Sequence, residues 1–384
     1  MGLFDSRFSF VPAVDSFAGR YFDEPAIRQW IVSRGIPNDV YDDFYLSELG
    51  GYVLSPEAGG KDCTFLERAA LIAQLTRKAG ATLPFLSDLL TNALISTMRS
   101  LSRHEISDYL RANSGRFLLS QAFSEDTAGS DASAVVTSIS LDEGTIRLDG
   151  CKTFVANGQF APHLLVLSRD SVFGRDDGGL SLWVAPIDAL GVSTYPLNSI
   201  GQEMLAPARV VFDHVMLEPD WRIQTEGKLN IMLKHQYALG RILVCASSLG
   251  LARAAMDDAI AHARTHMVKG MSLASLPQIQ EKIASMEVKL RAMEMLVQDA
   301  AEAVGGSDAD TLYLNCALMK YRVPALATEV SSDALQILGG RGYTDQARVG
   351  RIWCDCRGNQ IAQGTDEVVM HTAAKFLIKL AEKS

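Results

Sequence analysis

Four short segments contain the residues whose types and spacing could carry chemistry. Residues 122–131 (AFSEDTAGSD) combine small residues with hydroxyls, which can present N–H and O–H groups to a phosphate or a polar ring. Residues 152–158 (KTFVANG) include an aromatic ring that could stack on a flat cofactor. A surface turn and an ordinary strand with a turn are the alternative interpretations of these two segments.

The other two segments lie at expected helix ends. Residues 336–343 (QILGGRGY) place glycines after a helix, where glycine commonly ends it. A dinucleotide-binding fingerprint would open a helix instead, so this segment does not predict one. Residues 361–367 (IAQGTDE) place Thr365 or Asp366 at the start of the last helix, where both residue types are favoured as caps.

Three regions of different pattern must hold these segments in place. Residues 1–117 carry apolar residues at three- and four-residue spacing, for example in 66–80 and 86–98, which predicts an all-helical N-terminal domain. Residues 226–384 are again helical and rich in Ala, Leu and Met, which predicts a C-terminal four-helix bundle. The surplus of apolar residues on these long helices also predicts an oligomer.

Residues 118–225, between the two helical regions, carry short strand-like runs separated by Gly, Asp and Pro clusters. The connections are too short for crossover helices, so we expect a central antiparallel β domain. Residues 142–144 (DEG) predict a hairpin turn within it. The expected strands are 135–140, 145–148, 163–168, 180–186, 191–196 and 208–217. The expected fold class is therefore α+β.

Composition limits the partners of the chain. Its 384 residues include 36 basic and 45 acidic ones, and the net charge of −9 argues against binding to nucleic acid or an anionic membrane. No apolar run reaches the roughly 18 residues that span a bilayer, and the first residues do not resemble a signal peptide, so we expect a cytoplasmic enzyme. Cys354 and Cys356 form the one close cysteine pair, which is weak support for a metal, and we expect none.

In this order and at these separations, the segments resemble motifs of the acyl-CoA dehydrogenase family over residues 45–380. AFSEDTAGSD is similar to the family's TEPxAGSD, KTFVANG to KxWITNG, and QILGGRGY to Q-[IV]-[LF]-GG-x-GY. Residues 351–368 (RIWCDCRGNQIAQGTDEV) resemble the closing RxxRD and EGTxE stretch, and residues 54–60 (LSPEAGG) resemble the PExxGG loop. Five matches in order make the resemblance specific.

The resemblance implies an FAD cofactor held between the β domain and the bundle, in a homotetramer or homodimer that passes electrons to a partner. It implies that the substrate is an acyl thioester on CoA or a carrier protein, with Arg241 and Gly364 as substrate-binding positions. A solvated arginine at a helix start is the alternative interpretation of Arg241. The positions that the resemblance assigns to the flavin are Phe123, Ser124, Ser130, Phe154, Ala156 and Thr365. Those assigned to its adenosine and pyrophosphate are Gln336, Gly339 and Gly340, with Arg264 from a neighbouring subunit.

The sequence departs from the family where the reaction needs a base. Family members remove the α proton of the acyl group with a carboxylate while the β hydride passes to flavin N5. The usual position of that carboxylate holds Gln363, and a glutamine cannot take up a proton at ordinary pH. The other position known for it, before the arginine of the first bundle helix, holds Gly240. Phe154 and Ala156 also replace the family's Trp and hydroxyl residue. Losing a general base typically costs about 10²–10⁴ in rate.

Three functions remain open from the sequence. The first is an FAD-dependent oxidoreductase that dehydrogenates an acyl thioester or reduces its enoyl form, with a non-standard base. Residues 278–282 (QIQEK) resemble a short stretch of crotonobetainyl-CoA reductase, a member that runs in the reductive direction, and both directions stay open. The second is a flavin-dependent monooxygenase that uses O2 on a CoA- or carrier-bound metabolite, and the third is a non-catalytic subunit that binds FAD or acyl-CoA. Asp366 and Glu367 are the nearest carboxylates in sequence, where helix capping is the favoured interpretation.

Overall fold

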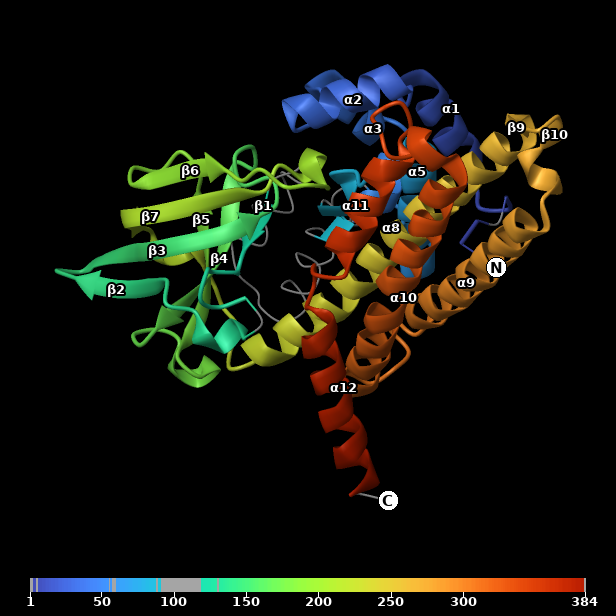
Figure 1. The fold of residues 1–384 in the computed structure, drawn as a ribbon. Helices are drawn as coiled ribbons and strands as arrows, with labels where there is room; N and C mark the ends of the chain where they lie inside the picture. The colour runs from blue at the N-terminus through green and yellow to red at the C-terminus, as the bar shows by residue number, and fades with distance from the viewer. Residues whose placement is uncertain are drawn as a thin grey trace.

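The structure is a computed structural model that describes residues 3–4, 6–54, 56, 60–87, 89–90, 119–129 and 131–382. A β-sheet and a block of long helices lie side by side, with the N-terminal helices across one end of the helical block (Figure 1). The helices described before residue 90 are α1 (Val11–Tyr21), α2 (Glu24–Ser33), α3 (Asn38–Leu46), α4 (Gly50–Val53) and α5 (Phe65–Ala79).

Helix α5 begins and ends where the sequence pattern of residues 66–80 predicts. Thr64 and Glu67 form a capping box, in which each side chain accepts a hydrogen bond from the backbone N–H of the other residue. Gly80 ends the helix in the left-handed region, with a φ of +58°, which glycine adopts without steric cost. The second helix expected in this region, residues 86–98, lies mostly outside the described residues.

The central sheet has the strand order β6-β7-β3-β2-β4-β5-β8, with β1 beside β4. Glu143 and Gly144 connect β2 to β3 with φ values of +48° and +83°, which are typical of a type I′ hairpin and confirm the predicted turn. The strands are β1 (Leu119–Ala122), β2 (Ser138–Asp142), β3 (Thr145–Val155), β4 (His163–Asp170), β5 (Leu180–Pro186), β6 (Val192–Pro196), β7 (Ala208–Leu217) and β8 (Arg222–Ile223).

The sheet is mainly antiparallel, as expected, but β4 has two parallel neighbours. Strand β1 pairs in parallel with residues 163–166 of β4, and β2 pairs in parallel with residues 169–170. The chain therefore continues in one direction along the same edge of β4 from β1 to β2. The connection between β1 and β2 contains turn-forming residues, but such residues do not indicate whether the next strand pairs in parallel or antiparallel, so the sequence pattern did not predict this arrangement.

The C-terminal region is helical, as the pattern predicts, and the whole chain has the expected α+β class. Its helices are α8 (Leu229–Thr265), α9 (Pro277–Glu302), α10 (Ala309–Leu338), α11 (Val349–Asn359) and α12 (Asp366–Ala381). A short hairpin of β9 (Met267–Val268) and β10 (Met271–Ser272) connects α8 to α9. The expected domain boundaries after residues 117 and 225 stay predictions.

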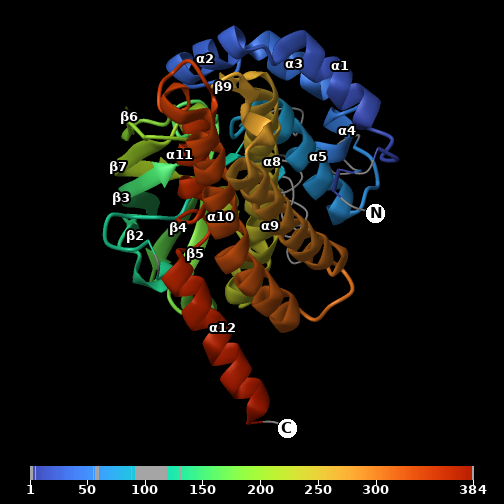
Figure 2. The same ribbon diagram turned by 45° about the vertical axis from the view of Figure 1, so that its right-hand side comes forward.

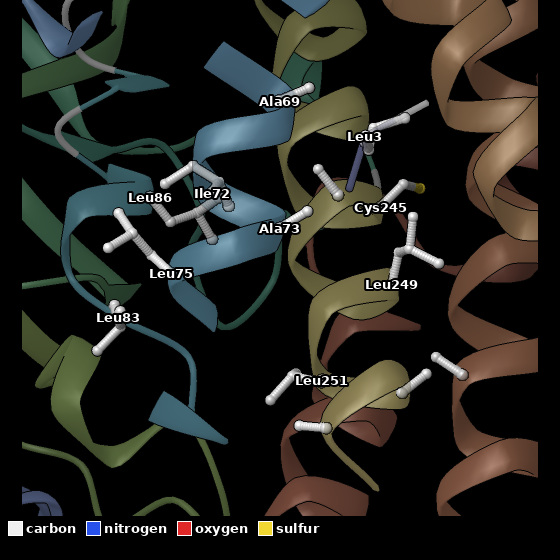
Figure 3. Close-up of a cluster of buried hydrophobic side chains, with 14 of the residues drawn as sticks. Leu3, Ala69, Ile72, Ala73, Leu75, Leu83, Leu86, Cys245, Leu249 and Leu251 are labelled. Carbon is white, nitrogen blue, oxygen red and sulfur yellow. The ribbon is translucent and has the colours of Figure 1, made fainter. Parts of the chain in front are cut away.

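Helix α8 is the central element of the helical block and packs against α5, α9, α10 and α11. By length and composition α8 could cross a membrane, but 94% of its apolar window is buried inside the protein, which is typical of a core helix. Figure 3 shows Ala69 and Ala73 of α5 pointing toward α8, while Leu249 points away from the other side of α8. A Cβ at Gly250 would collide with the Ala73 carbonyl oxygen, so glycine permits the close approach of α5 and α8.

Helix α11 connects the sheet to both helical regions through buried polar groups. The Asp355 carboxylate accepts hydrogen bonds from the backbone N–H of Thr82 at 2.7 Å and of Gln202 at 2.6 Å. Gln202 also donates its Nε2 to Asn359 Oδ1 at 2.7 Å. Burial raises the pKa of Asp355 to about 6, although the two N–H donors oppose this rise.

Candidate functional site

The two positions at which the family places its carboxylate lie at one point of the fold. Gln363 lies in the loop between α11 and α12, with a left-handed φ of +57°. A Cβ built on Gly240, in the interior of α8, would lie 2.7 Å from Gln363 Oε1 and 2.8 Å from its Cδ. The amide of Gln363 thus covers the space into which a longer residue 240 would project. Neither position supplies a carboxylate.

Arg241 follows Gly240 in α8 and is almost fully buried, with 2% of its surface exposed. Its Nε donates to the Gln363 carbonyl oxygen at 3.3 Å, and its Nη2 donates to Tyr313 Oη at 3.4 Å. The guanidinium carbon lies 4.5 Å from the centre of the Tyr313 ring, a cation–π distance. The interpretation of Arg241 as a solvated residue at a helix start is therefore wrong, because the side chain is buried in mid-helix.

Lys320 of α10 holds the closing loop that carries Gln363. Its side chain is fully buried, and Nζ donates to the carbonyl oxygens of Gln360 at 3.3 Å and Gly364 at 3.2 Å. Burial lowers the pKa of Lys320, while the Cys245 thiol and the Asp366 carboxylate oppose this effect. The left-handed φ of Gly364, +101°, completes the turn of the loop.

Sequence analysis missed Tyr313 and Lys320. The two residues are seven apart in α10, so they lie on the same face of the helix. Lys320 follows the apolar residues 317–319 and lies on the buried face of α10, and a charge on the buried face of an amphipathic helix was the signal that could have identified it. Tyr313 carried no comparable signal.

The segments that the resemblance assigns to the flavin lie side by side where β1 and β3 end, which we call the flavin edge of the sheet. Thr153 N donates to Ser124 O at 2.9 Å, and the hydroxyl of Ser120 donates to the carbonyl oxygen of Ala156. The loop after β1 and the end of β3 are thereby joined. Phe123 and Phe154, the two aromatic residues of these segments, are consequently brought to the same edge.

A buried ion pair fixes the loop after β1 in this position. Lys152 Nζ lies 2.7 Å from Glu125 Oε1, and both side chains are almost completely buried. Lys152 also donates to the Phe123 carbonyl oxygen at 3.1 Å. Glu125 accepts two further hydrogen bonds, from the backbone N–H of Val136 at 2.8 Å and of Thr137 at 3.0 Å. These bonds hold the backbone at Phe123, near the start of residues 122–131, and at Val136 and Thr137, which follow that segment.

The residues at this edge fit a flat aromatic group with polar margins. Phe154 is 71% exposed and has a left-handed φ of +55°, so its ring projects from the strand instead of packing into the core. Within the part of the chain that the structure describes, neither Nδ2 of the buried Asn157 nor Nε2 of Gln121 has a hydrogen-bond partner. Buried amide donors normally have a partner, so a bound group with acceptor atoms would satisfy them.

A hydrophobic cluster connects this edge to the region of Arg241. Phe123 packs against buried residues of the sheet and of the first turns of α8, and Tyr237 packs against the same cluster. Tyr237 precedes Arg241 by one helical turn. Burial raises the pKa of Tyr237 to about 12, so its phenol remains protonated at neutral pH.

The remaining positions assigned to the cofactor lie elsewhere in the chain. Gln336, Gly339 and Gly340 are exposed at the C-terminal end of α10, and Arg264 is exposed at the C-terminal end of α8. Gly339 ends α10, as predicted, with a φ of +59°. The end of α8 is about 35 Å from Arg241, at a rise of about 1.5 Å per residue. Within one chain, this group does not meet the residues around Gln363.

Thr365 and Ser130 are the last two residues that the resemblance assigns to the flavin. Thr365 is the N-cap of α12, which confirms the predicted start of the last helix. Ser130 lies outside the described residues.

Cys354 and Cys356 are two residues apart on α11, so their side chains point to different sides of the helix, and Cys356 is fully buried. The expected absence of a metal stays a prediction.

Two family models match the chain. The model described as "Acyl-CoA dehydrogenase, middle domain" matches residues 120–215, and the model described as "Acyl-CoA dehydrogenase, C-terminal domain" matches residues 230–378. Together they cover more than half of the sequence. The first matches the region of the sheet, and the second matches the region of helices α8 to α12.

Curated relatives and solved structures agree with these matches. The probable acyl-CoA dehydrogenase YdiO of Escherichia coli is 33% identical over 258 residues, which are 67% of this chain and 67% of the relative. An acyl-CoA dehydrogenase structure from Slackia heliotrinireducens is 36% identical with a TM-score of 0.83, covering 97% of this chain and 96% of that one. Butyryl-CoA dehydrogenase from Megasphaera elsdenii shares the fold, at 22% identity and a TM-score of 0.86, covering 96% and 97% of the two chains.

Proposed function

The chain belongs to the acyl-CoA dehydrogenase family, and we propose that it is an FAD-dependent oxidoreductase that acts at the Cα–Cβ bond of an acyl thioester. The observation that supports this reaction site is the contact between Gln363 and Gly240, because both family positions of the catalytic carboxylate meet there. We further propose that the chain works without an acid at that point. The cytoplasmic location stays a prediction.

FAD would supply the hydride acceptor of this reaction. The exposed ring of Phe154 and the partly buried ring of Phe123 fit the flat ring system, and Ser124, Ala156 and Thr365 are proposed to line it. The amide donors of Gln121 and Asn157, which no sequence pattern identified, lack a partner among the described residues and are suited to acceptor atoms of the cofactor. Their burial means that an acceptor must come from a bound group or water.

The adenosine end of the cofactor would be bound by a second copy of the chain. Gln336, Gly339, Gly340 and Arg264 are exposed and lie far from the residues around Gln363, which supports their action on a cofactor of the neighbouring subunit. Helix α12 extends away from the body of the protein in Figure 2, and its Leu377 and Ile378 are exposed. Exposed apolar side chains on a helix that projects in this way favour a homo-oligomer.

At the proposed reaction site, Gln363 can orient a thioester through hydrogen bonds but cannot remove its α proton. Among the described residues, the two buried thiols nearby do not replace the acid. Burial raises the pKa of Cys245 and of Cys316 to about 12, so both thiols remain protonated at neutral pH. Water or a basic group of the substrate would therefore have to accept the α proton. The same lack of an acid favours the second candidate, a flavin monooxygenase, whose reaction does not begin with α-proton removal.

Anaerobic absorbance spectra of the purified protein distinguish these functions. We expect bound FAD, and we expect its absorbance to bleach slowly with at least one saturated thioester from a panel of acyl-CoAs. If no thioester bleaches the flavin and the chemically reduced protein instead forms an oxygenated product with O2, the monooxygenase assignment replaces ours. Protein that binds acyl-CoA without FAD would be the non-catalytic subunit.

A further inference from the structure

The closing loop, residues 360–365 between α11 and α12, has a backbone conformation that needs support from outside. Two consecutive residues, Gln363 and Gly364, have left-handed φ values of +57° and +101°. Glycine adopts this region without steric cost, whereas a residue with a Cβ persists there only where surrounding contacts impose it. The turn sets the direction in which the Gln363 side chain leaves the backbone. The contacts that hold the turn therefore also place that side chain.

Buried cations from two other helices bind the carbonyl oxygens of the closing loop. The Lys320 ammonium of α10 donates to the carbonyl oxygens of Gln360 at 3.3 Å and of Gly364 at 3.2 Å. Arg241 of α8 donates to the carbonyl oxygen of Gln363, between these two, at 3.3 Å. Lys320 thus bridges the backbone on either side of Gln363, and α10 fixes the position of both ends of the turn.

The charge of Lys320 is balanced by the backbone of this loop. Its side chain is fully buried, and within the described ranges no carboxylate forms an ion pair with it. Gln360 is the C-cap of α11, so its carbonyl oxygen lies at the negative end of a helix dipole, where a cation is stabilised. A buried ammonium is costly unless such groups surround it. The placement of Lys320 and the conformation of the closing loop therefore depend on each other.

We propose that Lys320 is a positioning residue for the reaction, which acts by holding the side chain of residue 363 against Gly240. The inference rests on the proposed function, because it takes the contact between these two positions as the reaction site. A Cβ built on Gly240 would lie 2.7 Å from Gln363 Oε1. A reacting group that is misplaced by about 1 Å can lose about 10²-fold in rate. Without its lysine the closing loop can leave the left-handed turn, and residue 363 then moves away from this point.

A double-mutant cycle between positions 320 and 363 tests this role, because a carboxylate at position 363 reports on its own placement. The four FAD-loaded proteins are the unmodified chain, Gln363→Glu, Lys320→Met and the variant with both changes. Flavin reduction by the acyl-CoA that reduces the flavin best is followed anaerobically by stopped flow over a range of concentrations. The gain is the factor by which Gln363→Glu raises the limiting rate. We expect the gain to be at least about tenfold smaller in Lys320→Met, with a change below about threefold in the dissociation constant of the thioester.

Two further variants separate positioning from a general loss of stability. Lys289→Met is the matched control, because Lys289 of α9 also packs on α10, where it pairs with Glu329 and with Asp333 at 3.2 Å each. Its ion pairs lie on carboxylates instead of on the closing loop, so this control should keep the gain of the unmodified chain. Lys320→Arg keeps the charge and the N–H donors in a planar head of different shape, so it should keep part of the gain.

The inference is overturned if the gain is the same in folded Lys320→Met and in the unmodified chain, or if Lys289→Met loses as much of it. Should Lys320→Met not fold, Lys320→Arg decides, since a full gain there overturns the inference and a reduced gain supports it. If thioesters reduce the flavin but Gln363→Glu brings no gain in the unmodified chain, this inference fails while the proposed function stands. If no thioester reduces the flavin of any of these proteins, both fail.

Discussion

Replacing Lys152 by methionine should destabilise the flavin edge of the sheet strongly. The exposed fraction of the side chain is 0% for Lys152 and 3% for Glu125, so the variant leaves a carboxylate buried without its cation. Breaking a buried ion pair in this way typically costs about 3–5 kcal/mol, a large part of the total stability of a domain. The hydrogen bond to the Phe123 carbonyl oxygen is lost as well. We therefore expect a lower free energy of unfolding and a lower FAD content.

The pH dependence of this loss gives a second check on the same cause. Burial alone would raise the pKa of Glu125, but its bonds to Lys152 and to two backbone N–H groups hold that pKa below its ordinary value. A lowered pKa in the folded protein means that the pair stabilises the fold above the unfolded pKa, and that this stabilisation disappears as the pH falls through the folded value. The difference between the protein and Lys152→Met should accordingly be largest near neutral pH and smaller in acid.

Urea unfolding followed by circular dichroism, together with the flavin absorbance per protein, measures both effects. Arg209→Met is the matched control, because Arg209 pairs with Asp126 of the same motif at 3.0 Å but on the surface. We expect no measurable change in this control. A loss below about 1 kcal/mol in Lys152→Met, or an equal loss in Arg209→Met, would refute the assignment of Lys152 and Glu125 as a buried positioning pair.

Two further changes test the packing of the helices and the junction at α11. Gly250→Ala should destabilise the protein by about 1–3 kcal/mol, because the added Cβ would collide with Ala73 O. Gly19→Ala in α1 is the control, because open space surrounds its Cβ and no destabilisation is expected. Urea unfolding of both variants measures the difference. Ionisation of Asp355, whose pKa burial raises to about 6, costs stability, so the stabilising contribution of its protonated form is lost as the pH rises through 6. Asp355→Asn should remove that slope between about pH 4 and 6, the range between the unfolded and folded pKa values, and a thermal melting series with the same slope in both proteins would contradict it.

Local patterns predicted the elements well, whereas contacts between distant segments were beyond them. Strands β5 and β7 have the same bounds in the sequence prediction and in the structure, because alternation of side chains and turn residues are local signals. The parallel pairing of β1 and β2 with β4 depends on which distant strand each of them meets, and the turn residues between them do not indicate this, so no local signal marked it.

The candidate site shows the same division. Motif spacing identified Gln363 and Gly240 separately, but their contact depends on how the closing loop folds back onto α8. Arg241 could be interpreted as a surface residue because the sequence does not show that α8 is buried on all sides. A charged residue is usually exposed when no buried partner is known for it. Lys320 and Tyr313 were missed because their roles depend on what α10 meets, which is the closing loop at Lys320 and Arg241 of α8 at Tyr313.

The rate of flavin reduction in Gln363→Glu tests the central claim most directly, namely that the reaction site of this chain lacks only its proton acceptor. The variant and the unmodified protein are mixed anaerobically with the acyl-CoA that reduces the flavin best, and the absorbance decay is followed by stopped flow. A second variant, Gly240→Glu combined with Gln363→Ala, places the acid at the facing position with the glutamine side chain out of its way. We predict that Gln363→Glu is reduced about 10²–10⁴ times faster than the unmodified protein. Equal rates in a variant that holds FAD and binds the thioester would contradict the account.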